Sequence, residues 1–230
     1  MMLKNCLLSL TFITLAAVFG FSQGIKANPA ATPFPKETVK ANPRPTPKPE
    51  EPKGEPFDKA DVKTMAGQCV TLDTEAGLIE LELYPESAPE TVRSFLNLAA
   101  TGLFDTTTFS RVVPGFVIQG GHLWTHDGGI TKKVGERARR FLPDEPNKIL
   151  HERGVLSMAR GDEPNSATTD FFILVANASY LDGKFAAFGR VTKGMDVVDA
   201  INKAAVVDEK PEKPVKIKKA SVKSCTVAPD

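Results

Sequence analysis

The sequence predicts a mainly β domain over residues 65–230, built as a closed antiparallel barrel capped by two α-helices. Short apolar runs of strand length recur along this part of the chain, separated by Gly, Pro and polar turn signals. Two segments with helical spacing lie far apart in the sequence. Strands and helices therefore do not alternate as repeated βαβ units, and many short strands favour a closed antiparallel barrel.

The first strand with a clear pattern is Gly77–Tyr84. Its residues alternate, and Ile79, Leu81 and Leu83 fall on one face. This period of two is typical of a strand with one buried face.

A helix is expected next. Ser87 and Glu90 have the spacing of a capping box, and Pro89 fits a first helical turn. Apolar residues then recur at helical spacing, and Gly102 is placed to end the helix.

The remaining pattern is mostly β. A second, short helix is indicated by Met195, Val198, Ile201 and Asn202. Short strands are expected at 109–113, 116–119, 155–159, 171–175, 185–191 and 214–227, the first two of them joined by a Pro-Gly turn.

Residues 1–22 are predicted to be a secretory signal peptide. Lys4 gives a short basic start, and the apolar run Leu7–Phe21 is shorter than the about 20 residues of a membrane span. Gly20 and Ser22 allow cleavage after Ser22, and an uncleaved membrane anchor is the less favoured alternative. The chain is therefore expected to be exported, most simply to a bacterial periplasm, with no membrane attachment after cleavage.

Residues 23–64 are predicted to be a disordered, Pro-rich linker. Half of the 18 prolines lie between residues 28 and 57, with charged residues among them. Such a composition buries too little apolar surface to offset the entropy of ordering, and it favours extended polyproline II. A Pro-rich ligand for another protein's groove is the alternative interpretation.

Overall charge and motifs exclude several functions. The sequence has 29 basic and 28 acidic residues, and a net charge of only +1 argues against a nucleic-acid binder. Nucleotide-binding loops, nucleophile elbows and CxxC pairs are absent from the sequence. His122 and His126 are four apart but lie among glycines, so we expect exposed loop histidines and no metal site, with His151 capping a turn. No cofactor is expected.

Two polar residues interrupt apolar strands in the 109–121 stretch. Arg111 alternates with Phe109 and Val113, and Gln119 ends the next apolar run. A half-buried arginine is costly unless paired. Taken alone, this stretch favours a structural arginine that pairs with an acid.

Four ordered motifs resemble the cyclophilin family of peptidyl-prolyl cis-trans isomerases. They are Phe109-Ser-Arg-Val-Val-Pro-Gly-Phe-Val-Ile-Gln-Gly-Gly121, Gly154-Val-Leu-Ser-Met-Ala-Arg160, Thr168-Thr-Asp-Phe-Phe-Ile173 and Tyr180-Leu-Asp-Gly-Lys-Phe-Ala-Ala-Phe-Gly-Arg-Val191. Each motif alone is weak, but together, in order and at the family's spacing, they are highly specific. The resemblance spans about Cys69 to Val227 and implies an eight-stranded antiparallel barrel closed by two helices.

The resemblance also implies a site. Arg111 matches the catalytic arginine, Phe116 a wall of the proline pocket, and Gln119 the glutamine that binds the substrate backbone. These three are the predicted catalytic residues. The predicted substrate-binding residues are Val117, Ala159, Arg160, Phe172, Tyr180, Leu181 and Phe185. Proline-containing segments of other proteins are the expected partners, bound by a monomer.

Three residues depart from the family's usual pattern. Tyr180 replaces a tryptophan, Phe185 stands where many members have histidine, and Asp170 replaces a glutamine. Asp170 adds a carboxylate near the groove, where pairing with Arg111 or Arg160 is expected. These changes support a competing hypothesis, a domain that binds or tethers Pro-containing segments without useful turnover.

A further prediction concerns the two cysteines that follow the predicted signal peptide. Cys69 and Cys225 lie in the first and last strands of the domain, and those strands are neighbours in the resembled fold. In an oxidising compartment, a Cys69–Cys225 disulfide is therefore expected. Two small buried thiols are the alternative.

Overall fold

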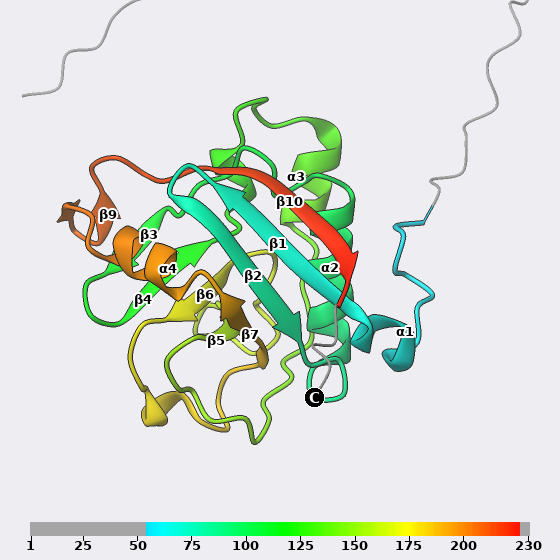
Figure 1. Ribbon diagram of the computed structural model, residues 1–230. Helices are drawn as coiled ribbons and strands as arrows, with labels where there is room; N and C mark the ends of the chain where they lie inside the picture. Colours follow the sequence, from blue (N-terminus) through cyan, green and yellow to red (C-terminus); the bar gives the residue numbers. More distant parts are fainter. Residues whose placement is uncertain (1–53, 226–230) are drawn as a thin grey trace, which may run out of the picture. The chain divides into compact units, whose positions relative to one another are not determined.

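The computed structural model describes residues 54–225, and they form a mainly β fold (Figure 1). Eight antiparallel strands make one curled sheet in the order β10-β1-β2-β7-β5-β6-β4-β3. The strands are β1 (Gln68–Thr74), β2 (Gly77–Leu83), β3 (Arg111–Val113), β4 (Val117–Gly120), β5 (Val155–Met158), β6 (Phe171–Leu174), β7 (Ala187–Lys193) and β10 (Ile217–Ser224). The predicted strands are confirmed to within a few residues at their ends.

Both predicted helices are present, as α2 (Pro89–Ala100) and α4 (Met195–Asn202). Several short elements were not predicted from the sequence, because each is too short to show a period. They are α1 (Val62–Ala66), α3 (Lys132–Ala138), the 3-10 helices η1 (Leu123–Thr125) and η2 (Ser179–Leu181), and a hairpin of β8 (Val206–Val207) and β9 (Lys210–Pro211). One of these, η1, lies between the two histidines for which a loop was expected. Within residues 54–225, no helix is both long and apolar enough to cross a membrane.

The sheet is not the closed barrel that was predicted. Its end strands, β3 and β10, share no ladder in the described part of the chain. The segment before β3 meets the start of β10 through the isolated bridge between Thr108 and Lys216 and through three backbone hydrogen bonds of 2.7–2.9 Å that join residues 106–109 to residues 215–217. Further along, the outer edge of β3 bonds to the β8–β9 hairpin: the amide of Val112 donates to the carbonyl of Glu209 at 2.8 Å. The hairpin occupies the place where a closing strand would pair.

The N-terminus of α2 is capped differently from the prediction. The N-cap residue is Ala88, whose side chain has no polar group, so Ser87 does not form the expected capping box. Instead the carboxylate of Glu145 accepts hydrogen bonds from the amides of Glu90 and Thr91, at 3.0 and 2.8 Å. A remote carboxylate thus satisfies the unpaired first-turn amides and complements the positive end of the helix dipole.

The main core lies between the sheet and α2. Phe95 of α2 is buried, and its ring centroid lies 5.1–5.2 Å from those of Phe104, Phe171 and Phe188. The amphipathic spacing of α2 places Phe95 in this cluster, while the period of two in β2 turns Ile79 and its alternate neighbours inward. Such edge-on aromatic contacts stabilise the fold beyond the area that they bury.

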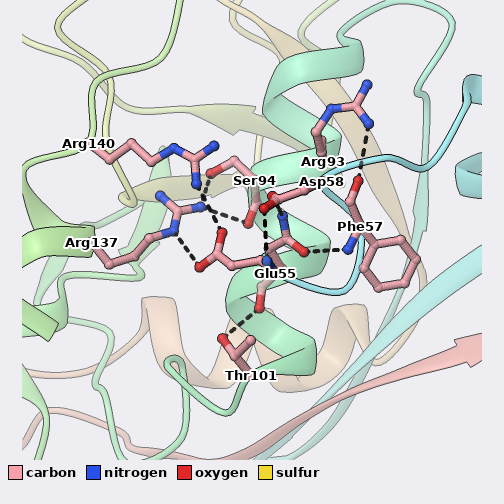
Figure 2. A network of polar contacts seen from close by, with 9 residues as sticks. Glu55, Phe57, Asp58, Arg93, Ser94, Thr101, Arg137 and Arg140 are labelled. Carbon is pink, nitrogen blue, oxygen red and sulfur yellow. Dashed lines mark hydrogen bonds and ion pairs between the residues drawn. The ribbon is translucent and has the colours of Figure 1, made fainter. Parts of the chain in front are cut away.

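The segment that precedes β1 is fixed to the domain (Figure 2). The Glu55 carboxylate accepts from Arg137 Nε at 3.2 Å and from Arg140 Nη1 at 3.1 Å. The Phe57 amide donates to Asn97 Oδ1 of α2 at 2.7 Å. The linker predicted over 23–64 therefore does not describe residues 54–64. The rest of that linker and the signal peptide predicted at 1–22 lie outside the described residues.

Strands β1 and β10 are joined covalently. They pair antiparallel, and Cys69 is disulfide-bonded to Cys225 just beyond the end of β10, with a Cα–Cα distance of 5.0 Å. The expected disulfide is confirmed. It closes a sequence separation of 156 residues and ties the two ends of the domain together.

Candidate active site

One pocket collects every residue that the sequence placed in the site. It has a volume of about 220 Å³. Strands β3 and β4 supply one side, the end of β5 and strand β6 another, and η2 with the turn before β7 the rest. The lining residues are Arg111, Phe116, Val117, Gln119, Ala159, Arg160, Phe172, Tyr180, Leu181 and Phe185.

The pocket floor is a small apolar cluster of its own. Val117, Phe172 and Leu181 are each less than a tenth exposed, and Phe116 and Phe185 pack against them. The Phe172 and Phe185 rings meet edge to face at 6.1 Å. These apolar walls surround a space suited to a small apolar ring.

Strand register places the polar residues of the pocket beside its floor. Arg111 of β3 pairs with Gln119 of β4, and Gln119 pairs with Phe172 of β6. In β3 the intervening Val112 points into the core, so Arg111 lies on the opposite face. Arg111 Nη1 donates to Gln119 Oε1 at 3.3 Å. Arginine, glutamine and phenylalanine thus form one row across three strands.

Arg111 also pairs with an acid, as the alternative interpretation of the sequence expected. Its Nε donates to Glu209 Oε2 at 2.7 Å. Glu209 was missed because it lies 98 residues away, in a hairpin that no pattern predicts. Both interpretations of Arg111 therefore hold at once, since it pairs with an acid and also lines the pocket.

Arg160 adds a second positive charge at the pocket edge. Its guanidinium carbon lies 4.9 Å from the centroid of the Phe185 ring, a cation–π distance. Its Nη1 donates to the carbonyl of Gly161 at 3.0 Å, while the Asp144 carboxylate is 3.9 Å from Nε.

Asp170 pairs with neither arginine, so that expectation was wrong. Its carboxylate lies 3.2 Å from Nδ1 of His122. His122 lies two residues after β4, and Asp170 directly precedes β6, the strand that pairs with β4. The hydrogen bond that Asp170 accepts from this ring raises the pKa of His122. This pair lines a second, polar hollow of about 270 Å³ that shares Gln119, Ala159 and Arg160 with the main pocket.

The other two histidines take separate places. His126 accepts a hydrogen bond from the Gly128 amide at 3.0 Å, within its own turn. His151 is buried, which its sequence context did not reveal. It contacts Asp182 through Nδ1 at 3.1 Å and Ser157 through Nε2 at 3.0 Å, and its ring stacks on Phe172. Burial lowers its pKa, so it supports the pocket wall as a neutral ring.

Comparison with known proteins agrees with this geometry. Residues 69–222 match the family described as cyclophilin type peptidyl-prolyl cis-trans isomerase/CLD. A peptidyl-prolyl cis-trans isomerase of Acinetobacter baylyi is 37% identical over 174 residues, which are 71% of this chain and 90% of that relative. Peptidyl-prolyl cis-trans isomerase A of Dickeya dadantii is 36% identical over 165 residues, covering 66% and 83%.

A solved structure shares the fold as well. It is a Cryptosporidium parvum cyclophilin type peptidyl-prolyl cis-trans isomerase, in the presence of the dipeptide Ala-Pro. It is 28% identical with a TM-score of 0.60, and the match covers 68% of this chain and 99% of that one. With its family motifs gathered around one pocket and this extent of similarity, the chain belongs to the cyclophilin-type peptidyl-prolyl cis-trans isomerases.

Proposed function

We propose that this protein accelerates rotation about X-Pro peptide bonds in exported proteins and so assists their folding. One observation carries the proposal: Arg111 and Gln119 line the same pocket of about 220 Å³ as the apolar side chains that would hold a proline ring. The Ala-Pro dipeptide used with the Cryptosporidium relative supports proline-containing segments as the ligand class.

The chemistry requires no covalent step. Rotation breaks amide resonance and has a barrier of about 18–20 kcal/mol, while the two X-Pro isomers are close in energy. The enzyme must therefore favour the twisted bond over both planar forms. In the twisted state the proline nitrogen regains its lone pair and becomes a hydrogen-bond acceptor.

Arg111 is proposed to donate to that nitrogen. A guanidinium has five donors and keeps its charge, and the bond becomes available only as resonance is lost. The floor of Val117, Phe172 and Leu181 holds the ring and excludes water, which strengthens the contact. Gln119 holds the substrate backbone on one side while the other side turns.

Export is proposed from two features. The first is the N-terminal sequence pattern of a secretory signal, and the second is the Cys69–Cys225 disulfide, which is typical of oxidising compartments. A bacterial periplasm fits both. Mass analysis of the protein isolated from the exported fraction tests this, with an N-terminus near residue 23 as the expected result.

The activity is tested by magnetisation-exchange NMR on an Ala-Pro peptide with the full chain. We expect accelerated exchange that falls at least tenfold in Arg111→Ala. The matched control is Arg153→Ala, which removes another partly exposed arginine paired with a carboxylate, Asp199, outside the pocket lining. Peptide binding without acceleration in the parent chain would favour the competing hypothesis, a binding module.

A further inference from the structure

Glu209 contacts two consecutive residues of β3. Its backbone carbonyl accepts from the Val112 amide at 2.8 Å, and its side chain accepts from Arg111 Nε at 2.7 Å. It lies in the two-residue turn between β8 and β9, and β9 lies beside β3 (Figure 1). A hairpin outside the main sheet therefore reaches the arginine of the pocket.

The conformation of this turn does not favour a glutamate. Asp208 and Glu209 both have positive φ, 49° and 62°. Two-residue turns with positive φ at both positions prefer Asn-Gly or Asp-Gly, since a glycine meets no steric penalty there. Asp208 follows this preference, but Glu209 stands at the glycine position. A residue kept in an unfavourable backbone conformation beside a functional site points to a role for its side chain.

Stability alone is a weak reason for the pair. The two side chains are 41% and 49% exposed, and ion pairs this exposed contribute little to folding. Their effect on orientation is larger, because a guanidinium is planar and its donors have a fixed geometry. Glu209 at Nε and Gln119 at Nη1 define the plane of Arg111. Among the described residues, these two hydrogen bonds use Nε and Nη1 of Arg111, so Nη2 can donate to a substrate atom.

We propose that Glu209 is a positioning residue that holds the Arg111 guanidinium in the orientation needed by the twisted X-Pro bond. The proposal rests on the isomerase function proposed above. Without Glu209, the long Arg111 side chain would sample several rotamers. It would then have to adopt the productive rotamer anew in each turnover. A misplacement of about 1 Å can lower a rate about 100-fold.

The test uses the full chain and three variants. Glu209→Ala removes the contact, Glu209→Gln keeps an acceptor without the charge, and Asp208→Asn removes the same charge from the adjacent position of the same turn. Exchange of the Ala-Pro peptide gives kcat and KM, and the ¹⁵N–¹H signal of Arg111 Nε reports the hydrogen bond directly.

We expect Glu209→Ala to lower kcat about tenfold or more with KM within about twofold, because the contact matters in the transition state and not in binding. Glu209→Gln should recover part of the rate, and Asp208→Asn should match the parent. The Arg111 Nε signal should shift and exchange faster with water in Glu209→Ala alone.

Two results would overturn the proposal. One is a Glu209→Ala variant with parental kcat and an unchanged Nε signal. The other is an equal loss in Asp208→Asn, which would show a general effect of charge. If the parent chain itself fails to accelerate exchange, the proposed function fails, whereas the Nε signal still shows whether Glu209 orients Arg111.

Discussion

Asp170 and His122 form a contact pair at the polar end of the groove, with His122 Nδ1 3.2 and 3.3 Å from the two carboxylate oxygens of Asp170. Neither residue lines the pocket that holds the apolar floor. Through Gln119 and Arg160, which line both hollows, the pair is nevertheless continuous with the candidate active site. Its charge state therefore changes the electrostatic potential along the groove.

The pair predicts a titration that depends on Asp170. The pKa of His122 is raised above its ordinary value of 6.5, mainly by the hydrogen bond that its ring donates to Asp170. Its stabilisation is thus fully present below pH 6.5 and is lost as the pH rises through the raised value. In Asp170→Asn the pKa of His122 should fall, as measured by NMR of the imidazole protons. Asp162→Asn is the control, because it removes an exposed carboxylate next in sequence to Gly161, which lines the same hollow. An equal shift there would contradict the assignment.

His151 predicts the opposite dependence on pH. Burial is the largest cause that lowers its pKa below 6.5. Its contribution to stability is therefore present above pH 6.5 and is lost as the pH falls through the lowered value, because a buried ring must then become charged. Urea unfolding at pH 7.5 and pH 5 should show this acid loss in the parent and a smaller one in His151→Ala.

At pH 7.5 His151→Ala should also lose about 2 kcal/mol, since Asp182 and Ser157 each lose a hydrogen-bond partner. His126→Ala is the matched control, because within residues 54–225 that ring makes a single hydrogen bond, which it accepts from the Gly128 amide in its own exposed turn. An effect of His126→Ala as large as that of His151→Ala would count against a specific buried network.

The features that the sequence predicted are those with a local period or motif. Phe95 sits on the apolar face of α2, and Arg111, Gln119 and Phe172 share a row because strand alternation fixes their faces. Long-range partners have no such signal. Ser87 had the spacing of a cap, yet the cap is supplied by Glu145, which lies 55 residues beyond its partner Glu90 and reaches the helix N-terminus only through the tertiary fold.

The same limit explains the errors in the fold. Alternation predicts strands but not which strands pair, so the open edge between β3 and β10 was not foreseen. The Pro-rich composition that suggests a linker continues to Pro56, but Phe57 bonds to Asn97 of α2 and Glu55 bonds to Arg137 of α3. Those partners lie 40 and 82 residues further along the chain. Composition carries no information on contacts of that kind.

Glu55 is predicted to be important for stability through Arg137. The Arg137 side chain is 5% exposed and relies on Glu55 and Ser94, whereas Arg140, the other partner of Glu55, is 52% exposed (Figure 2). Removing one member of a buried pair leaves a charge without compensation. Glu55→Ala should therefore lower the free energy of unfolding by about 3 kcal/mol.

Arg140→Ala provides the control in the same network. It removes an exposed partner of the same carboxylate, so it should lower the stability by less than about 1 kcal/mol. The midpoints of urea unfolding at constant m-value compare the two variants. Equal losses would show that burial of Arg137 does not decide the energetics of this contact.

The disulfide between Cys69 and Cys225 predicts a redox-dependent stability. It closes a sequence separation of 156 residues, and cross-linking so long a segment restricts the unfolded chain strongly. Reduction, or the double variant Cys69→Ser/Cys225→Ser, should lower the free energy of unfolding by about 2–5 kcal/mol. The measurement is urea unfolding with and without reductant, with alkylation and mass analysis to count free thiols.

The double variant is the internal control, since reductant should leave its unfolding midpoint unchanged. The bond joins β1 to the end of β10, far along the sheet order from β3, β4 and β6, which carry Arg111, Gln119 and Phe172. Exchange of the Ala-Pro peptide at 25 °C should therefore persist in the reduced protein while it stays folded. A reduced protein that is equally stable, with both thiols shown to be free, would contradict the prediction. Loss of exchange without loss of folding would instead couple this end of the sheet to the pocket.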